Sequence, residues 1–138
     1  MGHLRSALKN RMGGEAIEAA VMLPLVLLVI FAGMEFGWLV LRGVQLDAAA
    51  RAGAREAALS GSTSSTVQAA VDASLNSAGV NVYEVVLDPA DPQSADPGTP
   101  VKVNVSADYS EVGLLGFGNL MPLPDRLTGT SSMLKEDP

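Results

Sequence analysis

An uninterrupted apolar run near the N-terminus constrains this chain more than any other feature of its sequence. From Ala19 to Met34 no residue has a polar side chain, and after Glu35 the apolar character resumes over residues 36–41. As an α-helix, residues 19–41 extend about 34 Å at ~1.5 Å per residue. The hydrocarbon core of a bilayer is crossed by about 20 such residues. The run therefore predicts a membrane-spanning helix.

The charges on the two sides of this run predict its orientation. Residues 1–13 carry three basic side chains and no acid, whereas residues 42–138 carry six basic and twelve acidic ones. Because Lys and Arg accumulate on the cytoplasmic side of a span, we expect the N-terminus in the cytoplasm and residues 42–138 outside. The net charge of −6 also argues against nucleic acid as a partner, since phosphate binding requires a basic surface.

A cleaved secretory signal peptide is the alternative interpretation of the run. Signal peptides have an apolar region of roughly 7–15 residues, followed by a small-x-small cleavage site. The run here is longer, and no such site follows it before the chain turns polar. The membrane span is therefore the preferred interpretation.

The helical pattern continues beyond the apolar run. Residues 42–61 are rich in alanine, and no proline occurs from Trp38 to Leu59, so we expect one helix from about Glu15 to about Leu59, with Gly61 beyond its end. A span followed by a separate short helix is the alternative. Apolar residues recur along the helix at spacings of three and four, which predicts a helix-packing seam that permits close approach of another backbone. The seam consists of Phe36, Leu39, Gly43, Leu46, Ala50, Gly53 and Ala57.

The remainder of the chain predicts a small domain of one helix and a few strands. Residues 62–65 offer N-caps for a helix that ends at Gly79. Residues 80–87 have the composition of a strand. Residues 101–110 alternate between apolar and polar side chains, which is typical of a half-buried strand.

Two further segments complete this domain. The four prolines of residues 88–100 indicate a loop, and residues 126–136 form a last, weakly patterned strand. The expected fold class is α+β and membrane-anchored: a long N-terminal transmembrane helix extends into a small outer domain with one short helix and a two- to three-stranded antiparallel sheet. The expected organisation is a basic leader (1–13), a transmembrane helix (14–41), its continuation outside the membrane (42–61) and a small α+β domain (62–138).

Candidates for catalysis are scarce. The chain has no cysteine, and its one histidine is His3, so neither a thiolate nucleophile nor a Ser-His-Asp arrangement is expected. The acidic loop from Asp88 to Asp96 lacks the alternating oxygen ligands and the glycine turn of a calcium loop. We therefore expect no enzymatic activity, no metal and no cofactor.

Two carboxylates directly before the apolar run require an explanation. Glu15 suits a helix N-terminus, where acids meet the positive end of the helix dipole. Glu18 is harder to explain in this way, because the apolar run begins at the next residue. An ionisable side chain at the mouth of a membrane helix is costly, and such groups are usually functional or paired.

These residues resemble the processing site of type IV pilins and pseudopilins: a basic leader, Gly13, a glutamate five residues later and an apolar helix. Residues 13–59 are similar to the TadE-like family, minor pseudopilins of tight-adherence (Flp, type IVb) pilus systems. The likeness rests on the E-x-A-x-x-L-P-L pattern from Glu18, the M-E-F-G element and the A-A-R-x-G-A-R stretch. Ile17 departs mildly from the Val or Ala that family members usually have there.

The resemblance implies a pseudopilin-like fold and processing by a prepilin peptidase. Cleavage after Gly13 would make Gly14 the new N-terminus and Glu18 the fifth mature residue, whereas cleavage after Gly14 would make Glu18 the fourth. The implied function is structural, in pilus assembly and adhesion or in a related secretion system, whether or not the chain enters the filament. The implied location is the bacterial inner membrane, with the C-terminal domain periplasmic or extracellular. The implied partners are the prepilin peptidase, other pilin or pseudopilin subunits, the inner-membrane assembly platform and membrane lipid.

Two carboxylates are candidates for subunit assembly. After processing, Glu18 could neutralise the new α-amino group of a neighbouring subunit or that of its own chain. Glu35 lies on the flank of the seam in helical projection, where it faces either a partner helix or the outer headgroups. The alternative function is an uncleaved single-pass, membrane-tethered binding module with a periplasmic or surface partner. The mature N-terminus discriminates between the two.

Overall fold

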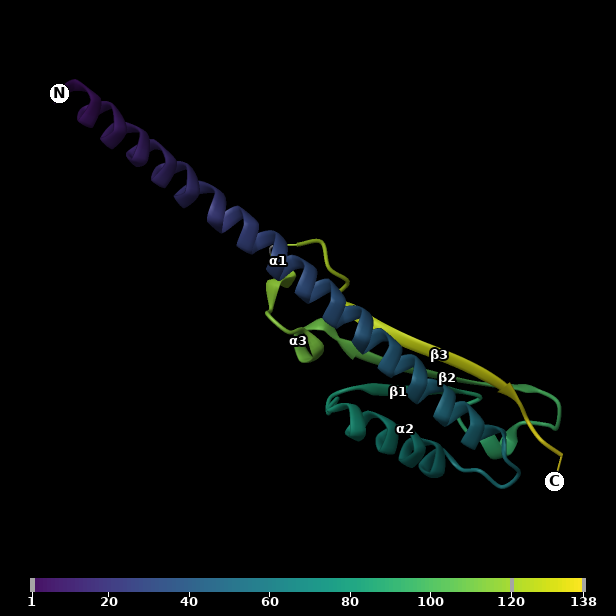
Figure 1. The fold of residues 1–138 in the computed structure, drawn as a ribbon. Helices are drawn as coiled ribbons and strands as arrows, with labels where there is room; N and C mark the ends of the chain where they lie inside the picture. Colours follow the sequence, from purple (N-terminus) through teal and green to yellow (C-terminus); the bar gives the residue numbers. More distant parts are fainter. Residues whose placement is uncertain (1, 120, 138) are drawn as a thin grey trace. The chain divides into compact units, whose positions relative to one another are not determined.

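The computed structural model describes residues 2–119 and 121–137, and the side chains of residues 14–118 and 121–137. The chain divides into two compact units, Met1–Phe36 and Gly37–Pro138. Their element order is α1, α2, β1, η1, β2, α3, η2 and β3 (Figure 1). The observed fold class is α+β, as predicted.

Helix α1 extends from Gly2 to Ala58 without a break. The alternative of a span followed by a separate short helix is therefore wrong. The helix begins well before the expected Glu15, because residues 2–12 contain no proline and are mostly good helix formers. Pro24 lies inside the helix without ending it.

The apolar part of the first unit is exposed. Large apolar side chains from Ile17 to Met34 are open to the surroundings. Among the described residues, the Gly14–Ala58 part of α1 is long and apolar enough to cross a membrane. No residue in its most apolar stretch is buried. A core helix of a soluble protein would bury these side chains, so the composition and exposure are those of a helix that could span a membrane.

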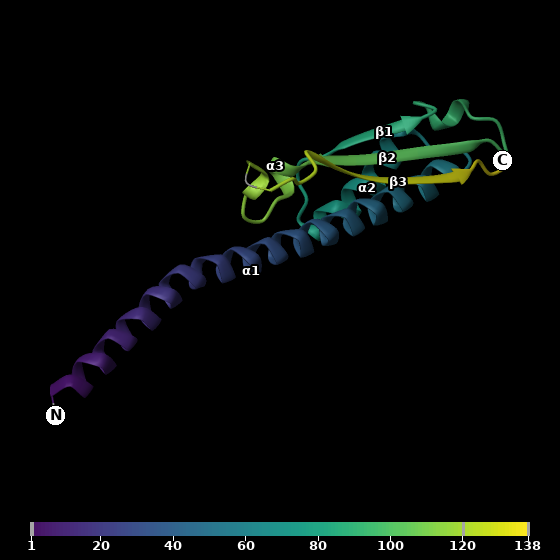
Figure 2. The ribbon, with the colours of Figure 1, turned by 90° about the horizontal axis from the view of Figure 1, so that it is seen from above.

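The second unit combines the C-terminal part of α1 with a helix and a sheet. Helix α2 covers Ser64–Ala78. Strands β1 (Glu84–Asp88), β2 (Pro100–Asp108) and β3 (Arg126–Leu134) form an antiparallel sheet in the order β1-β2-β3, visible side by side in Figure 2. The connections contain the short helical turns η1 (Pro92–Ser94), α3 (Tyr109–Val112) and η2 (Phe117–Asn119).

Helix α2 has the predicted ends. Its N-cap is Thr63, and the Thr63 and Thr66 side chains each accept a hydrogen bond from the other's backbone N–H, at 3.2 and 3.1 Å. This is a capping box, which satisfies two N–H groups that the helix leaves open. At the other end Gly79 is left-handed, with φ of 70°, a conformation that glycine adopts without a steric penalty.

All three strands differ from their expected bounds, and β3 ends at Leu134 instead of residue 136. The segment expected as a strand from Val80 becomes one only at Glu84, because the Val80 N–H donates to Leu75 O at 3.0 Å and thereby completes the C-terminal cap of α2. Strand β2 ends before Tyr109, whose N–H donates to Asp125 O at 2.8 Å at the start of the short helix α3.

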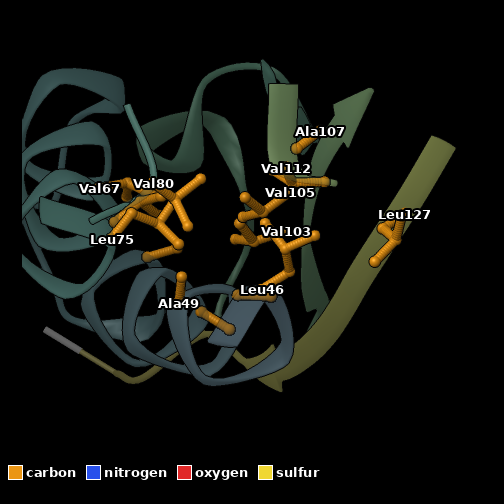
Figure 3. Packing of buried hydrophobic residues seen from close by; sticks show 14 of the residues in the cluster. Leu46, Ala49, Val67, Leu75, Val80, Val103, Val105, Ala107, Val112 and Leu127 are labelled. Atoms are coloured by element: carbon orange, nitrogen blue, oxygen red, sulfur yellow. The ribbon is translucent and has the colours of Figure 1, made fainter. Parts of the chain in front are cut away.

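The core of the second unit lies between α1, α2 and the sheet. In Figure 3 the side chains of Leu46 and Ala49 from α1 point toward Val67 and Leu75 of α2 and toward Val103 of β2. The alternation of β2 places its valines on this inner face, whereas its outer face is polar. Arg126 bridges Glu84 and Asp108 on the outer face at 2.9 and 2.8 Å.

Strand β3 closes the second unit at two points on α1. A Cβ atom at Gly129 would overlap the backbone of Leu46 and Asp47, so β3 crosses α1 in direct backbone contact. Lys135, just beyond β3, is buried, and its Nζ donates to Ala57 O, Leu59 O and Ser62 Oγ at 2.7–3.0 Å. These bonds satisfy carbonyls that the end of α1 leaves open.

A partly buried hydrogen bond joins α2 to the segment before β1 and predicts a pH dependence. The Tyr83 hydroxyl donates to Asp72 Oδ1 at 2.6 Å. Burial, the hydrogen bond and the charge of Asp72 raise the pKa of Tyr83 from 10.0 to about 12. Because the folded chain holds this proton more tightly than the unfolded chain, the stabilisation is complete below pH 10. It is lost as the pH rises toward about 12.

Absorbance of the phenolate tests this directly. Tyr109→Phe leaves Tyr83 as the one tyrosine of the full chain, since there are two in all. In detergent micelles we expect a midpoint near 12. Adding Asp72→Asn should lower the midpoint, because the negative charge that disfavours the phenolate disappears, while the burial and an amide oxygen that can accept the hydrogen bond remain. A midpoint near pH 10 with Asp72 intact would contradict the prediction.

Candidate processing and assembly segment

The expected cleavage site lies inside α1. The backbone of Gly13 is helical, and the residues whose side-chain environment the structure describes begin at Gly14. Gly14 is exposed, and a Cβ atom there would meet no atom within 4 Å. Two consecutive glycines weaken a helix by about 1 kcal/mol each relative to alanine. The pair is therefore a locally weak point of the helix.

The two carboxylates after this pair are not at the start of a helix. Because α1 begins at Gly2, its first turn contains no acid, and the helix dipole does not account for Glu15 or Glu18 in the uncut chain. Both side chains are exposed, and neither forms an ion pair with any side chain that the structure describes. Removal of residues 1–13 would place both acids near a new helix N-terminus with a free amine.

Glu35 has a different environment. Its side chain has no exposed surface, and the residue has an interaction partner. The neighbouring Phe36 is 49% exposed. The two residues of the M-E-F-G element thus differ in burial, and the role of Glu35 in subunit assembly stays a prediction.

The predicted seam packs largely against the chain's own domain. Leu39, Leu46, Ala50, Gly53 and Ala57 are buried. A Cβ atom at Gly53 would lie 2.8 Å from Val71 Cγ2 of α2 and 3.2 Å from Val103 Cγ1 of β2. Gly43 lies on the same face with open space around it. Small residues in the seam therefore permit α2 and β2 to approach α1 closely.

A pair of residues that the sequence analysis did not single out anchors α1 at the start of the second unit. The Arg42 guanidinium lies 4.5 Å from the centre of the Trp38 ring and donates to Ala78 O and Gln45 Oε1, both at 2.8 Å. Trp38 Nε1 donates to Val112 O at 2.8 Å. The sequence signal for this pair was the spacing of four between an aromatic and a basic residue on one helix, which places the two side chains next to each other.

Comparison with known proteins gives one family. Searches of curated proteins and of solved structures found no match. A family model described as TadE-like protein matches residues 13–55. The match includes Gly13, Gly14, Glu18, Glu35 and the seam up to Gly53. The family suggests a part in the assembly of tight-adherence pili. Residues 13–55 are therefore a TadE-like segment, which confirms the family inferred from the sequence.

Proposed function

We propose that the chain is a structural minor pseudopilin of a tight-adherence (Flp, type IVb) pilus or a related secretion system. The observation that carries the proposal is the position of Glu18. It is an exposed carboxylate of α1 directly before the apolar run, five residues after Gly13, within the TadE-like segment. An acid in that position is costly unless a partner neutralises it. The amine that processing would create supplies such a partner.

In this proposal residues 14–41 anchor the chain in the bacterial inner membrane. The basic leader stays in the cytoplasm, where a prepilin peptidase removes it, and residues 42–138 lie on the other side. The cleaved chain then docks with other pilin or pseudopilin subunits on the inner-membrane assembly platform. The role is structural, in assembly and adhesion, and needs no chemistry beyond the cleavage itself.

Pairing between subunits explains why the acid follows the cleavage site so closely. The new amine is cationic at pH 7. At about 4 Å and an effective dielectric constant of about 20, opposite charges attract by about 4 kcal/mol. Each subunit carries one amine and one Glu18 near the same depth, so a neighbour offset along the helix axis can satisfy both. This pairing would set the axial register between subunits.

The mass of the mature chain tests the proposal. Protein isolated from native membranes should lack residues 1–13 and begin at Gly14. Gly13→Val should leave the full 138-residue chain uncut, because a β-branched side chain does not fit a site that accepts glycine. Gly33→Val is the matched control, since Gly33 is a helical glycine with open space around it, and it should be cut normally.

The same measurement addresses the alternative function. An uncleaved wild-type chain would support a membrane-tethered binding module and contradict the pseudopilin proposal. Equal cleavage of wild type and Gly13→Val would show that the site is assigned to the wrong residue. A mature chain that begins at Glu15 would move the cut to the far side of Gly14.

A further inference from the structure

An apolar loop of the second unit has no function in the proposal above. Residues 112–124, here called the apolar loop, contain no ionisable side chain. Leu114 and Leu115 are 42% and 41% exposed, and Phe117 is partly exposed. Folded domains rarely expose adjacent large apolar side chains without a use for them.

The apolar loop is a built structure. Its base is closed where Tyr109 N donates to Asp125 O at 2.8 Å, and its interior contains the bond from Met121 N to Phe117 O at 3.1 Å. The loop wraps the Tyr109 ring so closely that a Cβ atom at Gly118 would lie 2.6 Å from Cε1 of that ring. The loop therefore presents Leu114 and Leu115 outward from a packed base, as in a compact Ω-loop.

The apolar loop is tied to α1 at the end of the apolar run. Trp38 Nε1 donates to Val112 O, the first residue of the loop, at 2.8 Å. On the same stretch of α1, Val40 and Leu41 are 67% and 46% exposed. These are the last residues of the run 19–41, and Arg42 is the first charged residue after it. The loop thus starts beside the residues of α1 at which the apolar run ends.

We propose that the apolar loop inserts Leu114 and Leu115 into the interfacial region of the membrane that α1 spans. The occupant of this surface is lipid on the outer side, and the loop is a second membrane contact that holds the domain against the bilayer. The inference rests on the membrane span of the proposed function. Lipid is favoured over a protein partner because the loop is joined by Trp38 to the end of the span, where lipid is already present. Trp and exposed apolar side chains are suited to this interface.

The absence of cysteine permits a direct test. Leu115→Cys in the full chain gives one site for a nitroxide label, and the protein is reconstituted in bilayers of phosphatidylethanolamine and phosphatidylglycerol. Collision with oxygen reports lipid, and collision with a water-soluble nickel chelate reports water. Gln93→Cys is the matched control, because Gln93 is exposed on η1. This turn follows the end of β1 at Asp88, which pairs with Lys102 near the start of β2, whereas the apolar loop follows the end of β2.

We expect a several-fold higher ratio of oxygen to nickel collisions at position 115 than at position 93. Equal ratios would overturn the proposal. Spin–spin broadening at position 115 that disappears on dilution with unlabelled chain, with little collision with either reagent, would also overturn it and assign the loop to a contact between copies.

A label in the middle of the run separates this proposal from the proposed function. Val29→Cys should report lipid if α1 spans the bilayer. Lipid at position 29 with water at position 115 would reject the loop contact and leave the span intact. Water at both positions would reject the span and, with it, both proposals.

Discussion

Gly129→Ala should destabilise the second unit by about 3 kcal/mol or more, the upper end of what overpacking a core costs. The new Cβ atom would overlap the backbone of Leu46 and Asp47. A side chain can rotate away from such a contact, but the helix backbone cannot move without separating α1 from β3. A domain of this size has a stability of only about 5–15 kcal/mol in total, so the loss is a large fraction of it.

Urea unfolding of the full chain in detergent micelles measures this effect. Trp38 is the one tryptophan, and its indole bonds to Val112 within the same unit, so its fluorescence reports this unit. Gly43→Ala is the matched control, because a Cβ atom there meets nothing within 4 Å and alanine favours helix. It should stabilise the chain by up to about 1 kcal/mol. An unchanged midpoint for Gly129→Ala would show that β3 does not cross α1 as described.

Glu18→Ala should abolish assembly while insertion and processing persist. An unpaired carboxylate costs at most a few kcal/mol at this depth, so its removal cannot impair insertion of the helix. What disappears is the counter-charge for the amine of a neighbouring subunit. The expected phenotype is therefore a mature, membrane-embedded chain that no longer crosslinks to other pilin subunits and no longer supports pili.

Crosslinking in native membranes and counts of surface pili measure this phenotype. Glu15→Ala is the matched control, because Glu15 is also exposed on the same helix but lies before the E-x-A-x-x-L-P-L pattern, and it should assemble normally. Glu18→Asp should be partly impaired, since the charge remains on a shorter side chain. Normal assembly of Glu18→Ala would show that the carboxylate has no role between subunits.

The features that could be predicted from the sequence are those that a short stretch of chain determines alone. The apolar run predicted the exposed helix, because membrane insertion depends on the composition of consecutive residues. The hydroxyl residues before α2 and Gly79 after it predicted its caps, because a cap forms between near neighbours. The alternation in residues 101–110 predicted β2, since successive side chains of a strand point to opposite faces. The leader, Gly13 and Glu18 also lie within one short segment, and their role stays a prediction.

The features that only the tertiary structure decided join residues far apart in the chain. The spacing of the seam predicted a packing face, but only the fold placed α2 and β2 of the same chain on it. The cap of α1 by Lys135 and the bond from Trp38 to Val112 join residues more than 70 positions apart. No sequence pattern marks Gly129. Glycine is required there only because β3 meets the backbone of α1. Periodicity reports which face of an element is apolar, whereas the partner of that face depends on how the whole chain closes.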